Sequence, residues 1–362
     1  MYCCSGLIIY LFPNRLMSSS RTIAGVALLL LLLFAPVVHA AQSGGGAGPA
    51  WSDATETAKI HHLGAIRSSR DAGGGKEGTI TLRKPYGVAV DLSGRMYVTD
   101  RGRIVFFHPG KKRSGFLGSG GTDAARSEPL GIAVSSDGRI FTADSAARKV
   151  FVHSADGKRI ASVGGAEELE LPCGVAVDER NGKLYVVDSR KHRVAVYGLK
   201  DYRLQRTIGS RGIKEKDKFN FPTSVAVDSR GTLYVVDTGN FRVQAFDRDG
   251  KYLRSIGGIG DAPGAFARPK GIAIDSEDHV YVVDAAFQNV QIFDTDGTLL
   301  YYFGTGGLGP GRFTLPAGIS IDEQDRIYVV DQWPGAVHMF QYAGKKFEEQ
   351  RKRSAPSGTG AR

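Results

Sequence analysis

The chain has 362 residues, of which 42% are hydrophobic and 9% aromatic, and this suffices for one large domain with a packed core. Its 48 glycines against 14 prolines predict many tight turns and therefore many short strands. The formal net charge is +10, but much of that excess lies near the two ends, so the body between them is only mildly basic. Without the N-terminal leader that holds Cys3 and Cys4, Cys173 is the single thiol, which excludes an internal disulfide.

An apolar run over residues 23–38 follows Arg21 and ends in Val38-His39-Ala40, the small-residue pattern that a signal peptidase recognises. The run has 16 residues, whereas a membrane span needs about 20. We therefore expect a signal peptide within residues 1–40 and hypothesise that translation starts at Met17, which would leave residues 1–16 outside it. The protein would be periplasmic or extracellular, with no stable membrane span after cleavage. An uncleaved signal would instead anchor it in the inner membrane.

The rest of the chain divides into three parts. Residues 41–58 are rich in Gly, Ala, Ser and Thr and predict a flexible linker. Residues 59–343 contain six copies of one pattern. The copies begin at Pro85, Pro129, Pro172, Pro222, Pro269 and Pro316. A spacing of 43 to 50 residues, with several strands in each unit, is typical of propeller blades. Residues 344–362 are predicted to be a basic, disordered tail.

Each repeat predicts four strands, for example residues 174–177 for a small inner strand and 233–236 for a β-branched and aromatic second strand. Residues 243–246 alternate as a third strand, and 253–257 form an outer one. The sixth repeat lacks its outer strand, but residues 59–66 have the matching spacing. We therefore predict an all-β, six-bladed propeller of four-stranded antiparallel blades, in which the N-terminal strand closes the last blade and removes a free edge.

The repeated pattern PxGVAVD…LYVVD…RVxxF resembles the NHL repeat family over about residues 59–343. The resemblance implies a six-bladed propeller. NHL propellers serve as protein-binding or RNA-binding modules, as extracellular sensor domains and, in one case, as a zinc lyase that cleaves peptidyl-hydroxyglycine. The resemblance therefore implies the fold much more narrowly than the function.

An aspartate ends the second strand of every repeat. The six are Asp100, Asp144, Asp188, Asp237, Asp284 and Asp331. Six carboxylates in a ring could suggest a metal site. However, each precedes a loop in which a carboxylate can accept backbone N–H bonds, and its presence in every repeat favours a structural role.

In a four-stranded blade, the loop after the second strand and the loop between blades emerge on the same face. That face would be basic over the first three blades and aromatic over the last three. The basic residues are Arg101, Arg103, Arg148, Arg190, Lys191 and His192, and the aromatic ones are Phe241, Phe287 and Trp333. Such a surface suits an anionic or extended ligand, with aromatic rings supplying contact area. A set of solvated loops is the alternative.

The residue after each repeat proline should lie at the mouth of the central channel. These residues are Tyr86, Leu130, Cys173, Thr223, Lys270 and Ala317. In the NHL-type zinc lyase, histidines at such positions hold the metal, and here none of the six is histidine. We therefore predict no metal site and no cofactor. Cys173 and Lys270 could form a reactive pair, but a lone cysteine on an inner strand is usually a small buried hydrophobe.

From these features we expect an exported, monomeric, non-catalytic binding or scaffold module for a protein, a peptide or a cell-envelope glycan. One alternative is a metal-dependent lyase or hydrolase that works at the channel mouth. The other is an RNA-binding module, which the predicted export disfavours.

Overall fold

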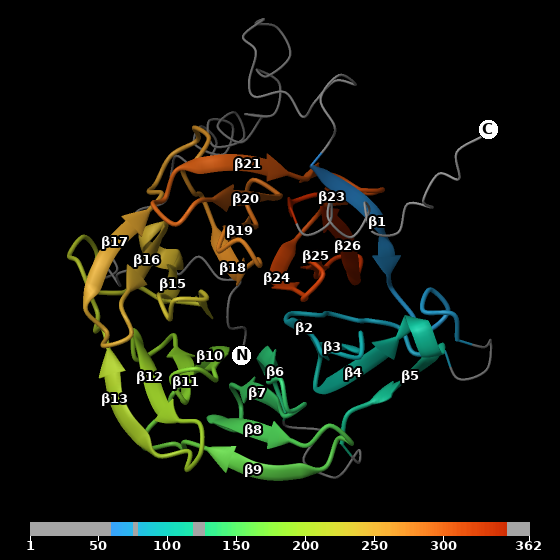
Figure 1. Cartoon of the computed structure of the whole chain (residues 1–362), viewed down its shortest axis with the longest axis horizontal. Helices are drawn as coiled ribbons and strands as arrows, with labels where there is room; N and C mark the ends of the chain where they lie inside the picture. The colour runs from blue at the N-terminus through green and yellow to red at the C-terminus, as the bar shows by residue number, and fades with distance from the viewer. Residues whose placement is uncertain (1–58, 75–78, 119–126, 346–362) are drawn as a thin grey trace, which may run out of the picture. The chain divides into compact units, whose positions relative to one another are not determined.

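The strands form a closed ring of six small sheets (Figure 1). The computed structural model describes residues 59–74, 79–118 and 127–345, all within the compact unit Trp51–Arg362. Each blade is a four-stranded antiparallel sheet, so the predicted six-bladed propeller is confirmed. The predicted signal peptide and linker, and nearly all of the predicted tail, lie outside the described residues. Within those residues, no helical segment is long and apolar enough to cross a bilayer.

The first five blades follow the chain in order. Blade 1 holds β2 (Val88–Val90), β3 (Met96–Asp100), β4 (Arg103–His108) and β5 (Arg113–Phe116). Blade 2 holds β6 (Pro129–Val134), β7 (Ile140–Asp144), β8 (Lys149–His153) and β9 (Arg159–Val163). Blade 3 holds β10 (Pro172–Asp178), β11 (Lys183–Asp188), β12 (Arg193–Gly198) and β13 (Leu204–Ile208).

Blade 4 holds β14 (Ser224–Val227), β15 (Leu233–Asp237), β16 (Arg242–Phe246) and β17 (Tyr252–Ile256). Blade 5 holds β18 (Pro269–Ile274), β19 (Val280–Asp284), β20 (Asn289–Phe293) and β21 (Leu299–Phe303). Blade 6 holds β24 (Pro316–Ile321), β25 (Arg326–Asp331), β26 (Ala336–Tyr342) and β1 (Ile60–Ile66). Short 3-10 turns are η1 (Pro109–Lys111) and η3 (Thr238–Asn240), and β22 (Thr305–Gly306) pairs with β23 (Arg312–Phe313) in the loop before blade 6.

The second strand of each blade is buried, apart from the first residue of β11 and of β25, because both of its faces pack against a neighbouring blade. In β15, Leu233 and Val235 join a cluster shared with blade 3, whereas Tyr234 and Val236 join a cluster shared with blade 5. Successive side chains of a strand point to opposite faces, so a strand between two apolar layers needs apolar residues at every position. This explains why the second strands read as unbroken runs of β-branched and aromatic residues.

The N-terminal strand β1 completes blade 6, as predicted. It pairs antiparallel with β26 from Ile60 opposite Tyr342 to Ile66 opposite Val337, with an irregularity between His62 and Gly64. In Figure 1, β1 lies on the outer rim beside the last strands of the chain. The ring is therefore closed by pairing the beginning of the described chain with its end, and blade 6 gains its missing outer strand.

The aspartates that end the second strands hold the loops that enter the inner strands. Asp188 accepts the N–H groups of Glu170 and Leu171 at 2.9 Å, and Asp331 accepts that of Leu315 at 2.7 Å. The same arrangement recurs at Asp100, Asp144, Asp237 and Asp284. The predicted structural role is thus confirmed. Most of the bonded N–H groups belong to residues just before the proline of the same repeat, so each carboxylate fixes where the inner strand of its own blade begins.

A second set of aspartates, at the opposite end of the inner strands, ends the repeated PxGVAVD pattern, but the pattern alone indicated no role for it. Asp91 accepts the N–H groups of Ser93 and Arg95 at 2.9 Å and the hydroxyl of Tyr97 at 3.1 Å. Burial, followed by the negative charge of Asp91, raises the pKa of Tyr97 to about 12. Equivalent pairs are Asp228 with Tyr234, Asp275 with Tyr281 and Asp322 with Tyr328. Blade 2 has Ser135 and Phe141 at these two positions, so the carboxylate and the phenol are replaced together.

Two buried histidines stand where other blades have different residues. His153 occupies the position of Phe246, and His338 occupies that of Gln244 and Gln291. Burial is the largest cause that lowers the pKa of each histidine to about 4. Both side chains are therefore held neutral inside the folded blades, while the unfolded chain would take up protons at their ordinary pKa of about 6.5.

The closure of the ring can be tested on β1 itself. We expect Ile66→Ala to lower the free energy of unfolding by about 2–5 kcal/mol, since Ile66 is 1% exposed and packs between blades 6 and 1. Leu63→Ala is the matched control, because Leu63 lies on the same strand and is 52% exposed; its effect should stay within about 0.5 kcal/mol. Urea unfolding measures both, and two equally small losses would contradict closure by β1.

The buried histidines predict a loss of stability in mild acid. Between pH 6.5 and 4 the unfolded chain binds more protons than the folded protein, so the free energy of unfolding should fall as the pH drops through this range. His153→Phe and His338→Gln, which restore the residues of other blades, should together reduce this fall. Melting temperatures of both proteins at pH 7 and pH 5 provide the measurement. If the melting temperature fell equally from pH 7 to pH 5 in the unaltered protein and in the double variant, the loss of stability could not be assigned to these two histidines.

Candidate functional site: the proline face and the central channel

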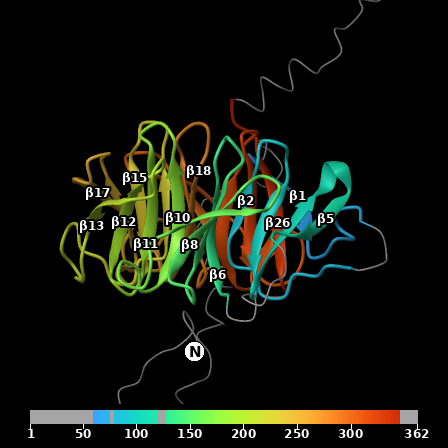
Figure 2. The ribbon, with the colours of Figure 1, turned by 90° about the horizontal axis from the view of Figure 1, so that it is seen from below.

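The blade topology sorts the loops into two faces (Figure 2). Each inner strand begins beside the end of the second strand, as Pro172 opposite Asp188 and Pro316 opposite Asp331 show. The loops between blades and the loops after the second strands therefore emerge at the same end of the ring. We call this end the proline face, since it carries the six repeat prolines.

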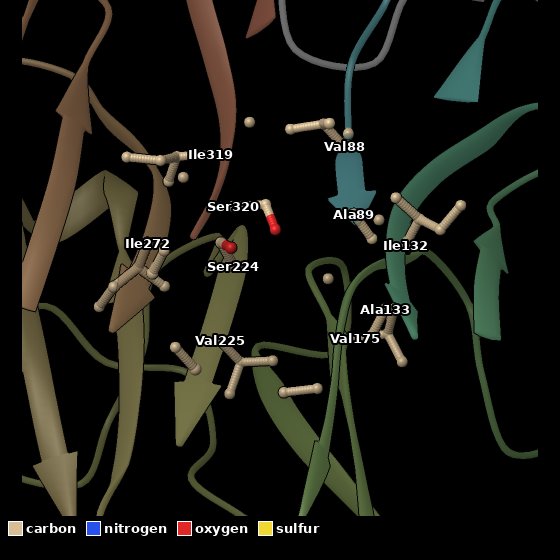
Figure 3. A pocket seen from close by; sticks show the side chains of 18 of the residues that line it. Val88, Ala89, Ile132, Ala133, Val175, Ser224, Val225, Ile272, Ile319 and Ser320 are labelled. Atoms are coloured by element: carbon tan, nitrogen blue, oxygen red, sulfur yellow. The ribbon is translucent and has the colours of Figure 1, made fainter. Parts of the chain in front are cut away.

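The inner strands enclose a central cavity of about 270 Å³ (Figure 3). Its wall consists mainly of Gly, Ala, Val and Ile residues, among which Ser224 and Ser320 bring hydroxyl groups. Close packing of adjacent blades dictates the glycines. A Cβ atom at Gly131 would lie 2.6 Å from the carbonyl oxygen of Cys173, and one at Gly271 would lie 2.4 Å from that of Ala317. The channel is therefore narrow because the inner strands of adjacent blades pack closely against one another.

Five of the six residues predicted for the channel mouth line this cavity, and they differ in how accessible they are. Leu130 is the exception and packs against the core cluster of blades 3 and 4. Tyr86 and Lys270 are half-buried, whereas Cys173 and Thr223 are buried. The sulfur of Cys173 contacts the carbonyl oxygens of Thr223 and Pro222 at 3.4 and 3.6 Å. The hydroxyl of Thr223 donates to the carbonyl of Lys270 at 2.9 Å. Cys173 therefore packs between blades 3 and 4, and this surrounding of carbonyl oxygens disfavours a thiolate.

The basic residues predicted for the proline face fall into two groups. Arg103 is bound to the buried Asp100 at 2.8 Å and to the carbonyl of Thr81, and Lys191 donates to the carbonyl of Glu167 at 2.8 Å. His192 is also buried and accepts the N–H of Phe221. These side chains hold neighbouring loops. The exposed members are Arg101, Arg148 and Arg190.

The aromatic residues predicted for the same face also differ in how exposed they are. Trp333 is 63% exposed. Phe241 is half-buried and packs against the core between blades 4 and 5. Phe287 is half-buried and lines a second cavity of about 450 Å³ on blade 5.

Several exposed apolar residues in the loops between blades were missed at the sequence level. They are Ile213, Phe221, Ile259 and Leu308, all of them before blades 4, 5 and 6. A large apolar side chain within a Gly-rich or Lys-rich loop is the feature that could have identified them. Together with Trp333, they make the proline face apolar over the half of the ring where aromatic residues were predicted.

The described residues offer no group of three or more His, Cys, Asp or Glu side chains that could hold a metal ion. His279 makes a different kind of contact, since its Nδ1 lies 2.9 Å from Asp275 at the opposite face. This hydrogen bond is the largest cause that raises the pKa of His279 above its ordinary value. The sites on the proline face that the structure displays are therefore the channel mouth, the exposed loop residues and the cavity on blade 5.

Comparison with proteins of known sequence gives short matches to repeat proteins. NHL repeat-containing protein 2 of Gallus gallus is 32% identical over 98 residues, which are 25% of this chain and 13% of that protein. RING finger protein nhl-1 of Caenorhabditis elegans is 34% identical over 109 residues, which are 29% of this chain and 11% of that protein. The chain thus spans only a small fraction of these relatives' own length.

Comparison with solved structures gives matches that cover most of the propeller. A structural genomics protein of unknown function from Bacteroides thetaiotaomicron has a TM-score of 0.63 and 16% identity, covering 78% of this chain and 76% of that one. A gluconolactonase from Xanthomonas campestris gives 0.54 and 21%, with coverages of 71% and 86%. Virginiamycin B lyase from Staphylococcus aureus gives 0.53 and 14%, with coverages of 78% and 99%. At these identities the likeness shows the fold alone.

Two family descriptions match the chain directly. Residues 50–258 match the SMP-30/gluconolactonase/LRE-like region, and residues 276–355 match a family described as a 6-bladed beta-propeller. The first match covers more than half of the chain. The protein therefore belongs to the SMP-30/gluconolactonase/LRE-like family and has the form of an NHL-type six-bladed β-propeller.

Proposed function

We propose that the protein is an exported, non-catalytic binding module that holds a protein, a peptide or a cell-envelope glycan on its proline face. The observation that carries the proposal is the exposure, on this one face, of Trp333 together with Ile213, Ile259 and Leu308. Large exposed apolar side chains that gather on one surface mark interaction sites, whereas scattered ones need no explanation. Trp and Arg are also the residues most enriched among those that dominate binding energy.

The exposed basic residues complement the apolar half of the face. Arg190 and Trp333 occupy the same loop position, two residues after the strand-end aspartate, in blades 3 and 6. These blades lie opposite each other in the ring (Figure 1). A ligand that spans the channel mouth would therefore meet a guanidinium on one side and an indole on the other. This arrangement supports an extended ligand with both anionic and apolar parts.

The proposed export rests on the sequence. The apolar run over residues 23–38, followed by Val38-His39-Ala40, supports secretion with cleavage after Ala40. A mature protein that begins at residue 41 would place the proline face outside the cytoplasm, where proteins, peptides and envelope glycans are its available partners.

A metal-dependent lyase or hydrolase at the channel mouth is the second candidate. Its support is the family membership and the fold shared with a gluconolactonase and with virginiamycin B lyase. Tyr86 and Lys270, both half-buried at the cavity, are the ionisable side chains that such an activity would use. Metal analysis of the purified protein separates the two candidates, because one bound metal ion per chain would favour the enzyme.

Site-specific photo-crosslinking tests the binding face. A photoreactive phenylalanine analogue at Trp333 should capture a partner in the cells that produce the protein, because this position is exposed on the proline face. The same analogue at Leu92 is the matched control, since Leu92 is also exposed and apolar but lies in a loop of the opposite face. Arg190→Ala should weaken capture from position 333. Equal capture from both positions, or none from position 333, would refute the face assignment.

A further inference from the structure

The cavity on blade 5 differs in kind from the central channel. It measures about 450 Å³ and lies between the loop 257–268 and strands β20 and β21. Its wall includes Asp261, Ala262, Phe287, Asn289, Gln291 and Tyr302. An acidic side chain, two aromatic rings and two amides therefore meet at one hollow of the proline face. The neighbouring blade shows what this architecture normally places there.

From residue 217 onward, blades 4 and 5 correspond at an offset of 47, as the pair Asp237 and Asp284 shows. Earlier in the loop before each blade, the loop of blade 5 is one residue shorter, since Arg211 pairs with Phe219 whereas Ile259 pairs with Phe266. In blade 4, Arg242 fills the region that corresponds to the cavity. Its Nε lies 2.9 Å from Asp237, and its Nη2 donates to the carbonyl oxygens of Glu215 at 2.8 Å and Lys218 at 3.0 Å. The guanidinium group therefore links the strand-end carboxylate to the loop that precedes the blade.

The same guanidinium position is used in two other blades. In blade 1, Arg103 joins Asp100 to the carbonyl of Thr81. In blade 3, Arg193 donates to the carbonyl of Glu168 at 2.6 Å. A planar group with several N–H donors is thus what this loop geometry accommodates.

Blade 5 has the same strand register and loop contacts as blade 4, but it has no arginine at this position. Asn289 stands at the position of Arg242 and pairs in the same register with Asp284. Gln291 accepts the N–H of Gly264 at 2.9 Å and donates to the carbonyl of Ala265 at 2.8 Å, as Gln244 does with its own loop in blade 4. The loop backbone at Gly264 and Ala265 is therefore held as that at Asp217 and Lys218 is, so the carbonyl groups of this segment keep their places. The asparagine side chain is too short to reach them, and the space that remains is the cavity.

Compared with blade 4, the residues around this position in blade 5 favour a cation supplied by a partner. The shorter loop of blade 5 carries Asp261 at its tip, where the longer loop of blade 4 carries Lys214, Glu215 and Lys216, so the rim is acidic instead of net basic. Phe287 replaces Asn240. Phe287 and Tyr302 line the cavity with aromatic rings, whose faces attract a guanidinium. The Oδ1 atom of Asn289 is buried and has no hydrogen-bond partner among the described residues. A buried acceptor of this kind gains from a donor that enters the cavity.

The geometry points to a docking site in blade 5 for an arginine side chain of a partner peptide. The guanidinium takes the place that Arg242 fills in blade 4, donates to the loop carbonyls and to Asn289, and faces the carboxylate of Asp261. Ile259, 77% exposed in the same loop, provides apolar contact for the flanking residues of the peptide. The inference rests on the proposed function in one respect, since it takes the proline face as the surface that meets the partner.

The test uses the full chain and three blocked tripeptides, acetyl-Gly-X-Gly-amide, in which X is arginine, lysine or citrulline. NMR titration should show saturable binding of the arginine peptide, with shifts at the amides of Gly264 and Thr305. Citrulline has nearly the shape of arginine without its charge, so it should bind about tenfold more weakly or not at all. Lysine should also bind more weakly, because it lacks the planar set of donors.

Asn289→Arg is the decisive variant, because it supplies the internal arginine of blades 1, 3 and 4. It should keep or raise the melting temperature and lose arginine binding by about tenfold or more. Asp261→Lys, which places a positive charge at the rim of the cavity, should weaken binding as well. Lys214→Asp is the matched control and should bind as the unaltered protein does, because Arg242 still fills blade 4.

Equal binding by Asn289→Arg and the unaltered protein would overturn the inference, as would equal binding of the citrulline and arginine peptides. If Asn289→Arg does not fold, unchanged binding by Asp261→Lys overturns it instead. Failure here is distinct from failure of the proposed function, because the crosslink from position 333 depends on blade 6 and does not involve Asn289.

Discussion

The propeller depends on one constraint: the second strand of every blade is apolar on both faces, so every blade needs a neighbour on each side. In a row of blades the first and the last would each leave one such face in water. Closing the row into a ring buries both of these faces. The pairing of β1 with β26 holds the ring closed. The cluster between blades 6 and 1 contains Ile66 of β1 beside residues of both blades, so the closing strand also contributes to the core.

In the closed ring, most of the repeated charged side chains are engaged in contacts that hold the blades and loops together. The carboxylates of both sets of repeated aspartates accept hydrogen bonds from backbone N–H groups and tyrosine hydroxyls. Arginines that look like ligand contacts in the sequence, such as Arg103 and Arg242, instead link a strand end to a loop. Function is therefore left to positions where one blade departs from the others. Trp333 in blade 6 and Asn289 in blade 5 are two such departures, and both lie on the proline face.

The sequence was sufficient for the fold because the repeat is long and regular. The spacing of the six prolines determined the number of blades, and the strand-like segment before the first repeat matched the strand missing from the last. The candidate site could be predicted less well from the sequence. Whether Arg103 or Lys191 is free depends on carbonyl groups 22 and 24 residues earlier in the chain, which a local pattern does not show. The cavity on blade 5 arises where an asparagine stands in place of the arginine of blades 1, 3 and 4, and it becomes visible only when two blades are compared in three dimensions.

Closure of the ring by the N-terminal strand is measured most directly by amide hydrogen exchange. Because β1 is hydrogen-bonded to β26 and completes the sheet, the amides of Ile60–Ile66 that face β26 should exchange slowly, with opening free energies close to those of β26. The two strands should lose their protection together as denaturant is added. Fast exchange throughout Ile60–Ile66 while β26 remains protected would contradict a closed ring.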